Sequence, residues 1–95
     1  MNPPLRRNRL RHAAFLVLFD AARPLEVHEI VEQLLALDQT FTRDPSRAVS
    51  DALRTEVLKN RVIRLEQGVY VIGDVTSRHV TYARSVVHPR LRRVA

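Results

Sequence analysis

The sequence contains no cysteine and no tryptophan, and only two of its 95 residues are glycine. The absence of cysteine excludes disulfide bonds and thiolate metal sites, and it suits a reducing compartment. Two isolated glycines, Gly68 and Gly73, cannot build the glycine-rich loops that hold phosphates in nucleotide-binding enzymes. No segment approaches the roughly 20 apolar residues that a membrane-spanning helix requires. Several large classes of protein are therefore excluded by composition alone.

Patterns typical of catalytic and metal sites are also missing. The four histidines, His12, His28, His79 and His88, lie far apart in the sequence, which favours surface histidines over a zinc site. No serine lies in the glycine-framed sequence of a nucleophile elbow. We therefore predict no catalytic residue, no metal and no cofactor, and we expect that the protein is not an enzyme.

The N-terminal region resembles a secretory signal at first sight, because arginines precede an apolar segment at 13–19. That apolar segment is short, and Asp20 interrupts it. Its removal would also leave the rest of the chain without a first helix. We therefore interpret 9–22 as a core helix and expect a cytoplasmic protein with no membrane partner.

Positive charge is concentrated in particular parts of the chain, whose net charge is +6. Residues 1–12 carry four arginines and no acid, and residues 75–95 carry five arginines and no acid. Residues 43–64 have a net charge of +3, whereas residues 13–38 have a net charge of −4. Clustered positive charge favours a polyanionic partner, because it releases counterions from a phosphate backbone. The preference for arginine over lysine by itself can reflect GC-rich coding.

Apolar residues at a spacing of 3.6 predict three amphipathic helices, at about 9–22, 26–37 and 45–59. The first has the widest apolar face and is expected to be the most buried. Pro24 and Leu25 form only a short extended link after it. Asp44 is the predicted N-cap of the third helix, and Pro45 occupies its first position, where a missing N–H is harmless.

The third helix separates apolar from polar residues. Its predicted inner face holds Val49, Ala52, Leu53 and Val57. Its opposite face holds Arg47, Ser50, Asp51, Arg54 and Leu58. Arginine and serine can contact base edges or phosphates in a major groove.

Two β-branched segments, 62–65 and 69–72, are separated by a turn containing Gly68 and predict a β-hairpin. A weaker pattern at 76–87 fits either a fourth helix capped by Ser77 or a frayed tail. The predicted fold class is thus α+β, mainly α: a winged helix-turn-helix of three helices and a two-stranded hairpin, the wing. The predicted divisions are a basic N-terminal arm (1–8), the winged-helix domain (9–73) and a basic C-terminal segment (74–95).

The residues at 23–30, the capped third helix and the hairpin at 61–72 together resemble winged-helix domains. The resemblance is closest to the HARE-type domain, which is attached to restriction enzymes and to subunits of the transcription machinery. It implies DNA binding or DNA-linked regulation with the third helix as the recognition element. The family also includes members that bind proteins instead.

We therefore expect a small transcriptional regulator or architectural protein that binds double-stranded DNA and is associated with the nucleoid. Its expected contacts are Arg47, Ser50 and Arg54 in the major groove, Arg43, Lys59, Arg61 and Arg64 on the backbone, and Arg6, Arg7 and Arg9 in an arm. A homodimer is expected, because one domain of this size offers limited contact area. The main alternative is a protein-interaction module that uses Leu58 and the apolar wing, and RNA binding is a weaker one.

Overall fold

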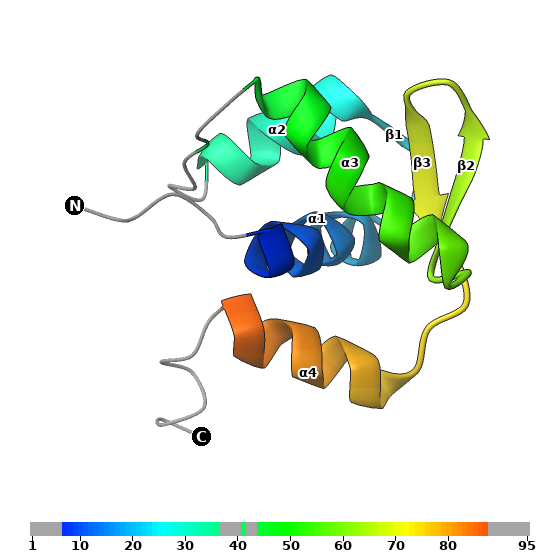
Figure 1. The fold of residues 1–95 in the computed structure, drawn as a ribbon. Helices are drawn as coiled ribbons and strands as arrows, with labels where there is room; N and C mark the ends of the chain where they lie inside the picture. Colours follow the sequence, from blue (N-terminus) through cyan, green and yellow to red (C-terminus); the bar gives the residue numbers. More distant parts are fainter. Residues whose placement is uncertain (1–6, 37–40, 42–43, 88–95) are drawn as a thin grey trace.

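The computed structural model describes residues 7–36, 41 and 44–87. These residues form four helices and three short strands, so the fold is α+β and mainly helical, as predicted. In chain order the elements are α1 (Arg7–Ala21), β1 (Leu25–Glu26), α2 (Val27–Ala36), α3 (Pro45–Leu58), β2 (Val62–Glu66), β3 (Val69–Ile72) and α4 (Ser77–Val87) (Figure 1). None of the described helices is long and apolar enough to cross a membrane.

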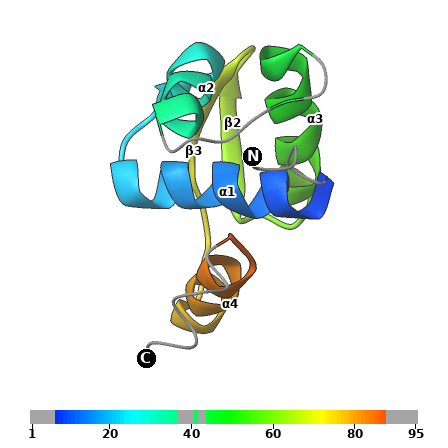
Figure 2. The same cartoon turned by 90° about the vertical axis from the view of Figure 1, so that its left-hand side faces the viewer.

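Helix α1 lies at the centre of the fold. It begins at Arg7 rather than at the predicted Arg9, and Leu10 and residues 12–18 are all buried. Helices α2 and α3 and the sheet lie on one side of α1, and α4 crosses it on the other side (Figure 2). The wide apolar face of α1 is therefore explained by its position, because neighbouring elements cover the helix on two sides. This covering removes most of its apolar surface from water.

Helices α2 and α3 cover the first side of α1 with one face each. Helix α2 buries Ile30 and Leu34. Helix α3 buries Ala48, Val49, Ala52, Leu53 and Glu56, and Val57 packs against the same core. The predicted inner stripe of the third helix is thus confirmed, with the addition of one carboxylate that the apolar pattern did not reveal.

The start of α3 differs in one detail from the prediction. Pro45 is its first residue, as expected, but the side chain of Asp44 makes no capping hydrogen bond. The backbone carbonyl of Asp44 instead accepts the N–H of Ala48 at 3.0 Å. Asp44 is thus the N-cap residue, as predicted, but its side chain does not cap the helix. The proline reduces the need for a cap, because it removes one of the unpaired N–H groups that a helix start would otherwise leave.

The sheet has three antiparallel strands in the order β1-β3-β2: the predicted hairpin is present as β2 and β3, and β1 adds a third strand to it. The additional strand β1 pairs Leu25 with Tyr70 and Glu26 with Val69. A further hydrogen bond joins the N–H of Val27 to the carbonyl of Gly68 at 3.0 Å. A strand of two residues is too short to produce an alternating pattern, so its sequence looked like a link.

The hairpin itself is irregular on its outer strand. Strand β2 pairs Arg64 with Tyr70 and Glu66 with Val69, so a β-bulge lies between Arg64 and Glu66. Gly68 in the turn has a φ of 76°, a positive value that glycine adopts without a steric penalty. At the other end, Asn60 has a φ of 61° and begins the chain reversal from α3 into β2.

Gly73 lies where the hairpin returns to the end of α3, and there a side chain has no room. A Cβ atom at this position would lie 2.6 Å from the carbonyl oxygen of Asn60 and 3.2 Å from the carbonyl carbon of Arg61. We expect Gly73→Ala to lower the free energy of unfolding by about 3 kcal/mol, because backbone atoms must move to admit the methyl group. Urea unfolding followed by circular dichroism measures the loss.

The matched control for this substitution is Gly68→Asn. A Cβ at Gly68 has nothing within 4 Å, and asparagine tolerates a positive φ better than most residues. We expect the control to lose less than about 1 kcal/mol. Equal losses in the two variants would contradict the assignment of a steric role to Gly73.

Helix α4 is present, so the tail is helical over Ser77–Val87. Its N-terminal cap is Thr76 rather than the predicted Ser77, because the Thr76 hydroxyl accepts the backbone N–H of His79 at 3.1 Å. Ala83 and Val87 are buried in the same core as α1. Serine and threonine side chains both favour the N-cap position, so the cap lies one residue before the predicted one.

Candidate nucleic-acid interface

The outer face of α3 carries the arginines that the sequence singled out. Arg47 and Arg54 are both exposed, whereas Ser50 is half-buried. The side chain of Arg54 is 77% exposed, and its Nη2 lies 3.7 Å from Oδ1 of Asp51 one turn earlier. A contact of this length between exposed groups contributes little and leaves the guanidinium available to another anion.

Two further predicted contacts flank this helix. Lys59 follows the end of α3 and is exposed, and Arg64 on β2 is exposed as well. We use the name α3–wing basic surface for the four exposed cations Arg47, Arg54, Lys59 and Arg64. Leu58 lies on the same outer stripe of α3, at i+4 from Arg54, and is 79% exposed.

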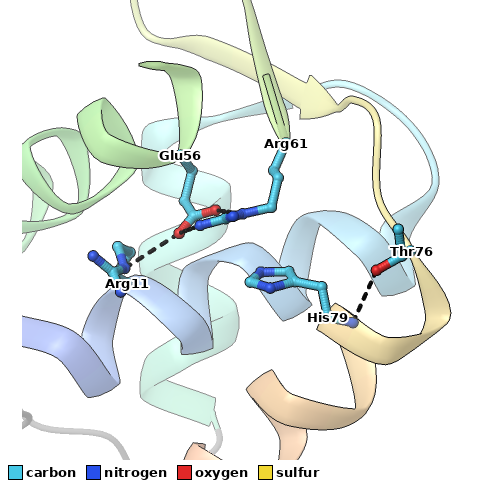
Figure 3. Close-up of polar contacts among 5 residues, drawn as sticks. All are labelled: Arg11, Glu56, Arg61, Thr76 and His79. Carbon is cyan, nitrogen blue, oxygen red and sulfur yellow. Dashed lines mark hydrogen bonds and ion pairs between the residues drawn. The ribbon is translucent and has the colours of Figure 1, made fainter. Parts of the chain in front are cut away.

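Arg61 does not share this availability. Its Nε donates to Oε2 of Glu56 at 2.6 Å and its Nη2 donates to Oε1 at 3.1 Å, which makes a two-point ion pair (Figure 3). Nε of Arg11 lies 3.2 Å from the same Oε1. The Glu56 side chain is fully buried, so we call Glu56, Arg11 and Arg61 the buried ion cluster. It joins α1, α3 and the start of β2.

Sequence reasoning missed Glu56, although a signal was present. Glu56 lies three residues after Leu53 and four after Ala52, so it continues the inner stripe of α3. A carboxylate at such a position is buried only when cations accompany it. The sequence therefore predicts that Arg61 contacts DNA, whereas its nearest partner, Glu56, lies inside the fold.

The predicted N-terminal arm is divided between described and undescribed residues. Arg9 belongs to α1, and its Nη2 donates to the carbonyl of Val87 at 2.9 Å, at the end of α4. Cations favour this position, because the C-terminal carbonyls of a helix carry partial negative charge. Arg7 is the first residue of α1, whereas Arg6 and Arg43 lie outside the described residues.

The histidines differ from the prediction that all of them lie on the surface. His12 on α1 is only 1% exposed, so that prediction was wrong for it. The centroid of its ring lies 5.9 Å from that of His79 and 5.4 Å from that of Tyr82, both on α4. His28 fits the prediction with a side chain that is 62% exposed, and His88 lies outside the described residues. Within the residues that the structure covers, no group of three or more potential ligands could hold a metal ion.

The acidic helix α2 has a local explanation for part of its charge. The carboxylate of Glu29 accepts the backbone N–H of Glu26 at 3.0 Å, which satisfies one donor at the helix start. This hydrogen bond lowers the pKa of Glu29 below its usual value, with a smaller contribution from Arg23. Glu26 and Glu32 are exposed. Glu29 and Glu32 belong to α2 and Glu26 to β1, whereas the exposed arginines of the candidate interface belong to α3 and β2.

Comparison of the chain with protein-family models, with curated proteins and with solved structures gives no match.

Proposed function

We propose that the protein is a small winged-helix protein that binds double-stranded DNA through the exposed face of α3. The observation that carries the proposal is the α3–wing basic surface, in which Arg47 and Arg54 extend from the outer side of a helix whose inner side is anchored in the core. The order of helices, followed by a hairpin beside α3, supports the same assignment. In this role the protein acts in the cytoplasm, on the nucleoid, as a transcriptional regulator or an architectural protein.

The proposed contacts separate into two kinds. Arg47, Ser50 and Arg54 lie on α3 and would approach base edges, where a guanidinium can donate two hydrogen bonds to guanine. Lys59 and Arg64 lie at the margins of the same surface and would hold phosphates, which fixes the register without specifying sequence. Binding would replace the 3.7 Å contact between Arg54 and Asp51, which is exposed and therefore weak.

The buried ion cluster has a supporting role in this proposal. Two N–H donors of Arg61, on Nε and Nη2, are engaged by Glu56, so Arg61 is not among the proposed phosphate contacts. Arg9 is similarly engaged with the end of α4. Their effect on DNA binding would be indirect, because they hold α3, the hairpin and α4 in place. A homodimer remains part of the proposal, since a single domain of this size offers limited contact area.

The test is a titration of the full chain with duplex DNA at several salt concentrations. We expect affinity to fall steeply as salt rises, because each phosphate contact releases counterions. Arg47→Ala and Arg54→Ala are each expected to weaken binding to a selected sequence by about 1–3 kcal/mol. Lys59→Ala should weaken all duplexes similarly and reduce the salt dependence by about one counterion.

The matched control is Arg23→Ala. Arg23 is also exposed, with 60% of its side chain accessible, but it lies in the connection between α1 and β1 and contacts Glu29 at 3.6 Å. We expect this variant to bind DNA as the unchanged protein does. Weak binding that is insensitive to salt, or an equal loss in Arg23→Ala and Arg54→Ala, would overturn the proposed DNA-binding surface.

A second candidate function is supported by exposed apolar side chains near the same surface. Leu58, Ile63 and Leu65 are 79%, 48% and 54% exposed. Aliphatic groups of this size gain more from burial against a protein than from contact with phosphates. A protein-interaction module would use these residues, and weak, salt-insensitive DNA binding is the result that would favour it.

A further inference from the structure

His79 is half-buried between α4 and the rest of the fold, and its Nε2 atom is buried. Its ring meets the ring of Phe15 on α1 edge to face, with 4.8 Å between the ring centroids. The centroid of the His12 ring lies 5.9 Å away. Figure 3 shows the His79 side chain extending from α4 towards the region of Glu56 and Arg61. The imidazole is therefore part of the contact by which α4 packs on α1.

Except for Glu56, the groups that face His79 are unfavourable to a further positive charge. From α1 they are Arg11 and His12, from α3 Glu56, and from the residue before β2 Arg61. The one carboxylate among them is already paired with both guanidiniums, at 2.6 Å from Arg61 and 3.2 Å from Arg11. A protonated His79 would add charge to a cluster in which the cations already outnumber the anion.

Two local features act in the same direction. Nε2 of His79 is buried and has no hydrogen-bond partner among the described residues, so a proton on this atom would be a buried, unsatisfied donor. In addition, His79 lies in the first turn of α4, three residues after its cap Thr76. The positive end of the helix dipole opposes a cation in this turn.

We propose that the docking of α4 on α1 is a pH-sensitive contact, in which protonation of His79 releases α4 from the core. Release would expose Phe15 and His12 of α1 and break the hydrogen bond from Arg9 to Val87. The exposed pair of Arg84 and Asp20, at 2.8 Å, adds little to the docking of α4, because ion pairs between exposed groups contribute little. The proposal concerns the fold itself and does not depend on DNA binding.

The sign of the effect follows from proton linkage. Burial lowers the pKa of His79 below the ordinary 6.5 of an imidazole, and Arg61 lowers it further. Because the docked state binds the proton more weakly than the released state, docking is strongest above pH 6.5 and weakens as the pH falls towards the pKa of the docked form. The ratio of docked to released α4 falls about tenfold for each unit that separates the two pKa values.

The experiment is a nuclear magnetic resonance titration of the full chain from pH 7.5 to pH 5.5. Ordinary carboxylates, whose pKa is about 4, stay ionised over this range. The titration follows the ring protons of His79 and the backbone amides of α4. We expect His79 to titrate below 6.5, and we expect the amides of Val80 and Ala83 to shift with the same midpoint towards the positions of an unpacked helix.

The matched variant is His79→Phe, which retains an aromatic ring beside Phe15 and removes the titrating group. We expect the α4 amides of this variant to be independent of pH over the same range. Amides that still move in His79→Phe would assign the effect to another group, such as His12, and would overturn the proposal. If His79→Phe does not fold, the titration of the unchanged protein still tests the proposal. Titration of His79 without a shift of the α4 amides would overturn the proposal as well.

Discussion

Glu56→Ala is expected to lower the free energy of unfolding by about 3–5 kcal/mol, one of the two largest effects that we predict for a single substitution in this chain. The Glu56 side chain is fully buried, and it is the shared partner of Arg61 at 2.6 Å and Arg11 at 3.2 Å. Its removal leaves two guanidiniums close together beside the core without the carboxylate that compensates them. Unfolding in urea, followed by far-ultraviolet circular dichroism, measures the loss.

Asp51→Ala is the matched control, because it removes a carboxylate from the same helix. Asp51 lies 3.7 Å from Arg54 on the outer face, where water and salt screen the interaction. We expect a change within about 0.5 kcal/mol. Losses of similar size in the two variants would mean that the buried ion cluster does not stabilise the fold more than a surface ion pair.

A double-mutant cycle separates pairing from packing in the same cluster. If Glu56 and Arg61 interact as their two-point geometry indicates, Arg61→Ala in the Glu56→Ala background should cost less than it does in the unchanged protein. The replacement of both residues by apolar ones can even restore part of the stability, since isolated buried charges are worse than none. The cycle uses the same unfolding measurement.

Phe15→Ala is expected to be of comparable size, with a loss of about 3–5 kcal/mol. Phe15 has no exposed surface. The centroid of its ring lies 4.8 Å from that of His79 on α4 and 6.3 Å from that of Phe19. Truncation would leave a cavity in the core beside the middle of α1. It would also remove the aromatic surface against which α4 packs. We expect the amides of α4 to exchange with solvent hydrogen faster than those of α3 in this variant.

Phe19→Ala provides the matched comparison for Phe15. It removes an identical side chain from the same helix, but Phe19 is only partly buried. We expect it to lose less than half as much stability as Phe15→Ala does, because a partly exposed ring transfers less apolar surface and leaves a smaller cavity. An equal loss would contradict the central place that we assign to Phe15.

The first three helices could be predicted from the sequence because each has a long periodic apolar pattern, whereas the weaker pattern of α4 left a frayed tail as an alternative. Helix α3 is the best example, since Pro45 fixes its first residue and Val49, Leu53 and Val57 define its inner face. Strand β1 could not be predicted in this way. Its two residues, Leu25 and Glu26, are defined by their partners Tyr70 and Val69, which lie far away along the chain.

The candidate site was only partly predictable, for a physical reason that Arg61 and Arg64 illustrate. Both are arginines at the start of the hairpin, and the sequence offers no difference in type between them. Arg64 is exposed, whereas Arg61 is bound to a carboxylate that is itself buried on the inner face of α3. Charge counted along a chain cannot separate a cation that faces solvent from one that is neutralised inside the fold.

The strand order β1-β3-β2 determines how the sheet meets other molecules in solution. Strand β3 is paired on both sides, and β1 offers an edge of only two residues, so β2 is the one longer edge among the described strands. That edge carries the charges of Arg64 and Glu66 with a bulge between them. Both features interrupt the regular backbone ladder that an additional strand would need. The fold thereby resists edge-to-edge aggregation even though Ile63 and Leu65 on the same strand are accessible to water.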